Sequence, residues 1–215
     1  MRIGALALTL LSCLAFGAPA GQVPTGMPTK LGVGLFEDTG KTGMRSSGVP
    51  YQLRYRYLTY GWSFNWGFGG APRDGVFALN YFKDCANQGF MPAISYYEIY
   101  DVPPSGMGQL QKMQNVAAMA EYFNDFKLLM VQAKAFGKPV LIMLEPDATG
   151  FLQGSVADNA NAPSAVASTG MPELAGLPNT AAGWGLAFLQ IRKSVGASNV
   201  VLGMHVSGWA GGSDI

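Results

Sequence analysis

The stretch PVLIMLEPDATGFLQ, residues 139–153, places two carboxylates directly after an apolar run. Val140 to Leu144 are consecutive apolar residues, which predicts a strand that is buried on both faces. Glu145 and Asp147 follow, one proline apart. Because proline has no N–H to donate to a neighbouring strand, Pro146 suits the end of a strand. The stretch therefore predicts a buried strand that ends at a pair of acids.

Strand and helix patterns alternate along the rest of the chain. Apolar runs predict further strands over residues 31–36, 53–61, 90–97 and 199–206, and helical spacing predicts helices over 74–88, 110–136 and 180–195. A Pro/Gly/Ser/Asn-rich stretch over 154–179 predicts a loop. This alternation indicates an α/β protein with a parallel sheet covered by helices, and both a doubly wound sheet and a (β/α) barrel fit it.

Polar residues that follow the predicted strands favour the barrel. They are Glu37-Asp38, Asn65-Trp66, Glu98 to Asp101, Glu145 to Asp147 and His205 to Trp209. Active sites of such barrels lie at the carboxyl ends of the strands. No GxGxxG or P-loop pattern follows a strand, so nucleotide binding is disfavoured. We expect a TIM-like (β/α) barrel over residues 30–215 with only its first five strand–helix units, in a chain that is part of a longer protein.

Composition narrows the class of partner. Charged residues make up 13% of the chain and the formal net charge is +1. An average soluble domain is about 25% charged, and nucleic-acid binding requires a basic surface. We therefore expect uncharged polar partners and no nucleic acid, and the sequence leaves the oligomeric state open.

The first residues have the pattern of a signal peptide over 1–20. Arg2 is followed by a mostly apolar run and then by Ala18-Pro19-Ala20, a small-x-small cleavage site. Residues 21–29 form a leader. The apolar run is too short to span a bilayer, so secretion is expected; the alternative is a lipid anchor on Cys13. Cleavage would leave Cys85 as the single cysteine, which we expect to be buried in a helix.

The paired acids have two interpretations from pattern alone. Carboxylates on the carboxyl edge of a sheet, flanked by apolar residues, can have raised pKa values and act as acids. If the strand continued regularly, Glu145 and Asp147 would also share a face. In the structural alternative, Asp147 caps the next helix and Glu145 binds an arginine.

The segment IMLEPDATGFL resembles the V-I-E-P-D-S-L-A-N-L motif of family 6 glycoside hydrolases, which cleave β-1,4-glucans with inversion. YYEIYDVPP and NVVLGMHVSGWAGG are similar to two further segments of that family, so the resemblance covers about residues 90–209. The L-P-D-R-D-C run and the aspartate of D-A-G-H are missing. The chain also resembles uncharacterised secreted bacterial proteins that read V-E-P-D on this strand.

The resemblance implies roles for three carboxylates. Asp147 would be the general acid, Asp101 would support it, and Glu145 would orient it or bind sugar. The general base would lie outside this chain, about 6.5–9.5 Å from the acid in an inverting enzyme. In retaining barrels a Glu after the fourth strand is the acid, which would be Glu145, although Leu144 stands where those enzymes have Asn.

Aromatic residues near the strand ends support a carbohydrate ligand, because ring faces stack on the C–H faces of sugars. The candidate substrate-binding residues are Trp62, Trp66, Tyr96, Tyr97, Glu98, His205 and Trp209. We expect Trp62 or Trp66, but not both, at the ligand surface. One histidine provides no standard zinc site, so no metal or cofactor is expected. The second functional hypothesis is a non-catalytic carbohydrate-binding or structural barrel.

Overall fold

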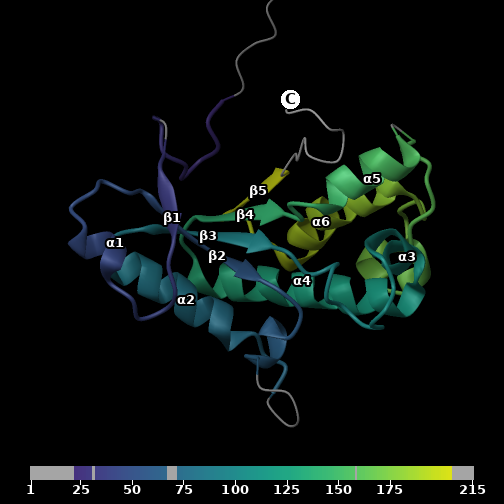
Figure 1. Cartoon of the computed structure of the whole chain (residues 1–215), viewed down its shortest axis with the longest axis horizontal. Helices are drawn as coiled ribbons and strands as arrows, with labels where there is room; N and C mark the ends of the chain where they lie inside the picture. Colours follow the sequence, from purple (N-terminus) through teal and green to yellow (C-terminus); the bar gives the residue numbers. More distant parts are fainter. Residues whose placement is uncertain (1–21, 31, 67–71, 158, 205–215) are drawn as a thin grey trace, which may run out of the picture.

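A five-stranded parallel sheet forms the centre of the protein (Figure 1). The computed structural model describes residues 22–30, 32–66, 72–157 and 159–204. The strands are β1 (Gly34–Phe36), β2 (Leu53–Leu58), β3 (Met91–Tyr96), β4 (Val140–Leu144) and β5 (Val200–Met204). The predicted α/β class and parallel sheet are confirmed, and each strand lies within its predicted range. Residues 205 and 206 of the fifth range are outside the described residues.

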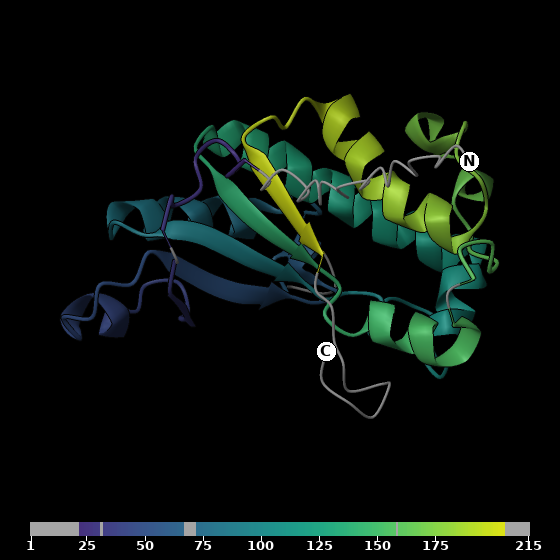
Figure 2. The same cartoon turned by 90° about the horizontal axis from the view of Figure 1, so that it is seen from above.

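The strand order β1-β2-β3-β4-β5 follows the chain without reversal. Three helices, α2 (Val76–Asn87), α4 (Val116–Phe136) and α6 (Ala181–Val195), lie along one face of the sheet (Figures 1 and 2). Crossovers between parallel strands are almost always right-handed, so an order that never reverses sends every connection over the same face. A doubly wound sheet reverses its order, and the described strands therefore do not have that arrangement.

The predicted helix over 110–136 is two helices, α3 (Gln109–Gln114) and α4. Asn115 between them has an extended backbone, and its side chain accepts a hydrogen bond from the Ala118 N–H at 3.0 Å. Asparagine competes in this way with the helical hydrogen bonds and favours a cap. The shorter elements are α1 (Gly43–Ser46), α5 (Ala148–Val156) and the 3-10 turns η1 (Trp62–Phe64), η2 (Ala167–Thr169) and η3 (Pro172–Leu174).

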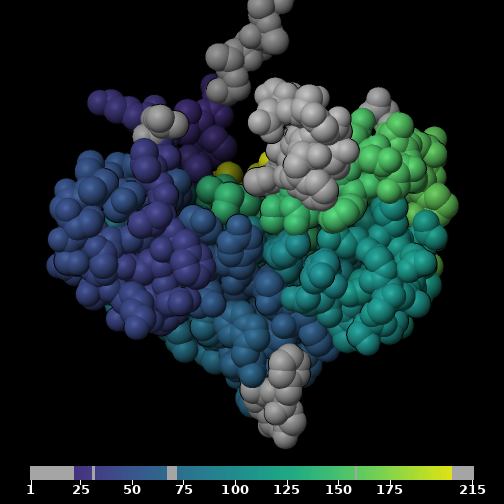
Figure 3. Space-filling model, in the orientation of Figure 1, coloured from purple at the N-terminus to yellow at the C-terminus, as the bar shows by residue number. Residues whose placement is uncertain are grey.

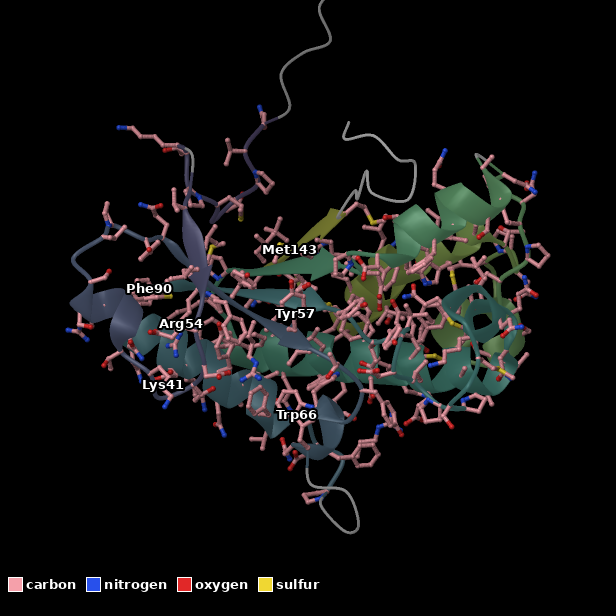
Figure 4. The ribbon with its side chains drawn as sticks, viewed as in Figure 1. Lys41, Arg54, Tyr57, Trp66, Phe90 and Met143 are labelled. Atoms are coloured by element: carbon pink, nitrogen blue, oxygen red, sulfur yellow. The ribbon has the colours of Figure 1, made fainter. Side chains whose placement is uncertain are left out.

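The two faces of the sheet have different environments. On the helix side Ile94, Tyr96 and Ile142 are fully buried against the helices, where Cys85 of α2 is also buried as predicted. On the other side, alternate residues of β2 to β4 line an open groove of about 300 Å³, among them Tyr57 and Met143 (Figure 4). The carboxyl ends of the strands therefore lie between a packed layer and an open one.

Candidate functional site

β4 ends at Leu144, and Glu145 follows it directly. Glu145 has a φ of 41°, in the left-handed region that residues other than glycine seldom adopt. The strand does not continue regularly, so the condition under which Glu145 and Asp147 would share a face is not met. The two carboxylates consequently have different neighbours.

Glu145 is fully buried and bound to backbone. Its Oε1 accepts hydrogen bonds from the N–H groups of Glu98, at 3.0 Å, and Ile99, at 3.1 Å. Burial raises the pKa of Glu145 to about 7, against the opposing effect of these two donors. Glu145 therefore ties the loop after β3 to the end of β4, and these two N–H groups take the place of the arginine that the structural alternative expected.

Asp147 is half-buried and immediately precedes α5. Its Oδ2 accepts a hydrogen bond from the Tyr97 hydroxyl at 2.7 Å. Its side chain makes no capping hydrogen bond to α5, so the helix-cap interpretation of this aspartate is wrong. Burial and then the Asp147 carboxylate raise the pKa of Tyr97. Asp147 thus presents a carboxylate held by a phenol rather than by backbone.

Two tyrosines extend this surface. Tyr97 stacks on Tyr100 with ring centroids 6.3 Å apart and planes 12° apart, and Tyr100 is 60% exposed. Tyr57 of β2 contacts Tyr97 edge-on, with centroids 6.2 Å apart. We call Tyr97, Tyr100 and Asp147 the rim. It presents an exposed aromatic ring next to a carboxylate at the carboxyl end of the sheet.

Asp101 lies near the rim in sequence but has other contacts. It is exposed, its N–H donates to the Glu98 carbonyl at 3.0 Å, and its charge partly offsets the lowering of the Lys112 pKa by burial. Among the described hydrogen bonds, none joins Asp101 to Asp147. Its role as a partner of the acid stays a prediction.

Three predicted substrate-binding residues are buried instead. Trp62, Tyr96 and Glu98 have no exposed surface. The Trp62 Nε1–H donates to Glu98 Oε2 at 3.1 Å, and the Tyr96 hydroxyl donates to the Tyr122 carbonyl at 2.7 Å. Because adjacent residues of a strand face opposite sides, Tyr96 and Tyr97 could not both reach the rim. In this structure these three side chains pack inside the protein and present no surface to a ligand.

The other predicted aromatic positions lie away from the rim or outside the described residues. Trp66 is half-buried on the α2 side (Figure 4), with its ring 4.4 Å from that of Phe77 and the Arg56 guanidinium 4.9 Å from its centroid. The Trp66 ring therefore packs against the Phe77 ring and the Arg56 guanidinium. His205 and Trp209 are outside the described residues, so their predicted roles stay predictions.

A buried acidic cluster lies beneath the rim, and we define it as Glu98, Asp125 and Glu145. All three side chains are fully buried. The Arg73 guanidinium donates to Asp125 Oδ1 from Nε at 2.9 Å and from Nη2 at 2.5 Å. Burial and then the Asp125 charge raise the pKa of Glu98 well above its ordinary value. Within the cluster, the Arg73 guanidinium therefore pairs with Asp125, and Glu98 has no cation partner among the ion pairs of the described residues.

Sequence reasoning missed Asp125. The signal was a charge within the apolar stripe of α4, in line with the buried residues Ala118, Tyr122 and Leu129. A charge on the buried stripe of a helix implies a buried partner. Arg73, which lies far away in the chain, is that partner.

The parts of the chain that the structure describes contain neither a cluster of metal-ligating side chains nor a membrane-spanning helix. No group of three or more His, Cys, Asp or Glu residues there could hold a metal ion. None of the helices described is both long and apolar enough to cross a membrane.

Comparison with known proteins adds no relative. No protein family, curated protein or solved structure matches the chain.

Proposed function

We propose that this protein hydrolyses the glycosidic bonds of a polysaccharide with Asp147 as the proton donor. The observation that carries the proposal is the 2.7 Å hydrogen bond from the Tyr97 hydroxyl to Asp147, beside the exposed Tyr100 ring. An aromatic ring binds the apolar face of a sugar, and a half-buried carboxyl group beside it can reach a glycosidic oxygen.

In the proposed reaction, protonated Asp147 gives its proton to the glycosidic oxygen as the bond from that oxygen to the anomeric carbon breaks. The Tyr97 O–H stabilises the carboxylate that remains, because a hydrogen bond to the charged form favours it. A water molecule adds to the anomeric carbon and loses a proton to a base. The proposal assigns no residue to that base.

We propose a (β/α) barrel as the complete architecture. The unreversed parallel order, the helices on a single face and the open groove on the other face support a sheet that curves toward closure. The position of the rim supports the same proposal, since barrel enzymes bind substrates at the carboxyl ends of their strands. The pattern of residues 1–20 supports export, with the lipid anchor on Cys13 as its alternative.

A second function, carbohydrate binding without hydrolysis, has one observation in its favour. The Glu145 carboxylate is committed to two backbone N–H groups, and Asp101 is not hydrogen-bonded to Asp147, so no described carboxylate directly assists Asp147. In that case the rim would bind sugar and cleave nothing.

The test is release of reducing ends from a panel of glucans, xylans, mannans and chitin by the full chain and by Asp147→Asn. We expect the variant to lose about 10²–10⁴-fold of the rate, the usual contribution of a general acid. The control is Glu173→Gln, a carboxylate of η3 paired with Lys127 at 2.8 Å, which should leave the rate unchanged. Equal rates for Asp147→Asn and the parent would exclude Asp147 as the acid, and binding without any release would favour the second function.

A further inference from the structure

Two carboxyl oxygens within the buried acidic cluster have no hydrogen-bond donor. The Trp62 Nε1–H donates to Glu98 Oε2 at 3.1 Å, and the Arg73 guanidinium donates to Asp125 Oδ1. The remaining oxygens, Glu98 Oε1 and Asp125 Oδ2, are buried and receive no hydrogen bond from the ionised side chains that the structure describes. Buried polar atoms nearly always have a partner, because leaving them unpaired destabilises the fold. These two oxygens therefore require a further donor.

Glu98 and Asp125 supply that donor themselves when one of them is protonated. Their side chains lie within hydrogen-bonding reach of each other. An ionised carboxylate only accepts hydrogen bonds, whereas a protonated carboxyl group also donates one. One proton between Glu98 Oε1 and Asp125 Oδ2 therefore pairs both oxygens at once.

The charges around the two carboxyl groups also favour a proton. Arg73 is the cation that the ion pairs of the described residues bring to the cluster, and it is shared between Asp125 and the more exposed Glu121. The other titratable groups that face the two carboxyl groups are acids or phenols: Glu145, Tyr60, Tyr96 and Tyr122. A charge on Glu98 would have no cation partner among them, and burial and then the Asp125 charge raise the pKa of Glu98 well above its ordinary value.

We infer that Glu98 and Asp125 share one proton, and that this proton forms a pH-sensitive link between the loop after β3 and α4. When the proton leaves for solvent, both carboxyl groups are ionised, and two like charges are in contact in a buried site. Because groups that interact this closely titrate together, the proton belongs to the pair rather than to either residue. Rising pH therefore breaks the link, and falling pH restores it.

The link acts on the segment that carries the rim tyrosines. Glu98 directly follows Tyr97, and its carbonyl oxygen accepts hydrogen bonds from the N–H groups of Asp101, at 3.0 Å, and Val102, at 2.9 Å. Tyr100 lies within this turn. In the space-filling view the residues that follow β3 and those of α5 lie side by side on the surface (Figure 3). Loss of the link should therefore loosen Tyr97 and Tyr100, whatever ligand the rim binds.

Infrared spectroscopy of the full chain tests for the proton, because the carbonyl band of a protonated carboxyl group is separate from the bands of carboxylates. Spectra are recorded from about pH 6, where an ordinary glutamate is ionised, to about pH 9. The difference between the parent and Glu98→Gln isolates Glu98, because Glu145 contributes to both spectra. We expect a protonated carboxyl band in this difference at the lower pH, and its loss as the pH rises.

Asp125→Asn tests whether the proton is shared. Asparagine gives Glu98 an N–H donor and removes the neighbouring charge, so Glu98 should ionise and the band should disappear although Glu98 is still present. The matched control is Glu173→Gln, whose carboxylate is paired with Lys127 at 2.8 Å and which should leave the band unchanged.

Amide hydrogen exchange tests what the proton does. At the pH at which the band is lost, residues 97–102 should exchange about tenfold or more faster in the parent than in Glu98→Gln, because glutamine keeps an acceptor for Trp62 and a donor for Asp125 at every pH. At lower pH the two proteins should exchange alike, and the amides of α2 should match throughout. If Glu98→Gln does not fold, the parent is compared with Asp125→Asn by infrared spectroscopy and with its own α2 amides by hydrogen exchange across the same pH range.

Four outcomes overturn the inference. The first is a difference spectrum without a protonated carboxyl band at any pH, and the second is a band that survives Asp125→Asn, which would place the proton on Glu98 alone. The third is a band that persists until the protein unfolds. The fourth is equal exchange of residues 97–102 before and after the band is lost, relative to the matched protein or to α2.

Discussion

Glu145 and Asp147 are separated by one proline, yet the first is fully buried and the second is half-exposed at the rim. Glu145 accepts two backbone N–H groups, and Asp147 accepts one side-chain hydroxyl. The positive φ of Glu145 interrupts the strand between them. Two residues of one chemical class therefore have different environments: the first fixes the loop after β3, and the second keeps part of its surface exposed to solvent.

The same contrast holds between the buried acidic cluster and the rim. The loop that Glu145 holds through Glu98 and Ile99 is bounded by Tyr97 and Tyr100. The rim is therefore positioned by the carboxyl group of Glu145, which has no exposed surface. If this is correct, changes in the cluster should affect stability strongly, and changes in the rim should affect it weakly.

Glu145→Ala should produce the largest loss of stability. It leaves the N–H groups of Glu98 and Ile99 buried without an acceptor, at about 1–3 kcal/mol each, so the free energy of unfolding should fall by about 3–5 kcal/mol. Asp147→Ala leaves only the Tyr97 hydroxyl, which lies at the rim, without its partner. The free energy of unfolding of this variant should therefore fall by only about 1 kcal/mol. Urea unfolding measures both, and equal losses would remove the distinction between the two acids.

The pH dependence of Glu145 should be the next effect in size. Its pKa is raised from 4.5 to about 7 in the folded protein. The folded state therefore keeps a proton that the unfolded state releases, so stability falls as the pH rises from about 4.5 to about 7, by up to about 3 kcal/mol. Glu145→Gln keeps an acceptor for both N–H groups and should remove this part of the slope.

The measurement is urea unfolding at pH 4.5, 5.5 and 7 for the parent and Glu145→Gln. The raised pKa of Glu98 acts in the same direction, so the variant should retain a shallower slope. Identical slopes for the two proteins would show that Glu145 does not titrate in this range.

The fold was largely predictable because its signals are local. Apolar runs, helical spacing and stop residues such as Gly137 mark every strand and the three long helices. The break at Asn115 was missed because the apolar stripe continues through it, while the cap depends on one side-chain hydrogen bond. Strand order follows from tertiary packing, which no single stretch encodes, and the two candidate arrangements could only be separated by structure.

The candidate site was predictable only in part. The sequence located Asp147 and Tyr97, but it also proposed Trp62, Tyr96 and Glu98, which are buried. Residue type alone predicts sugar binding equally well for a buried aromatic ring and for an exposed one. The face of the sheet toward which each side chain points depends on where its strand ends, which the sequence does not mark.

Arg73→Ala tests the deepest part of the cluster. Asp125 would remain buried without its cation, which costs about 3–5 kcal/mol for a fully buried pair. Because Arg73 is 29% exposed, solvent screens the pair, and we expect a loss of about 2 kcal/mol. The control is Lys127→Ala, whose ion pair with Glu173 has side chains that are 43% and 8% exposed and whose loss should stay below about 1 kcal/mol, because solvent screens the exposed Lys127. Losses of the same size would mean that solvent screens the Arg73–Asp125 pair as strongly as the Lys127–Glu173 pair.

The smallest effect should come from the rim itself. Tyr97→Phe removes the hydroxyl bound to Asp147 and should lower the free energy of unfolding by about 1 kcal/mol. Tyr57→Phe, whose ring contacts Tyr97 edge-on, is the matched control and should change it by less than about 0.5 kcal/mol. A double-mutant cycle of Tyr97→Phe with Asp147→Ala should give a coupling energy of about 0.5–1 kcal/mol. A coupling of zero would mean that the Tyr97 hydroxyl does not hold the Asp147 carboxylate, and that these two members of the rim are independent of each other.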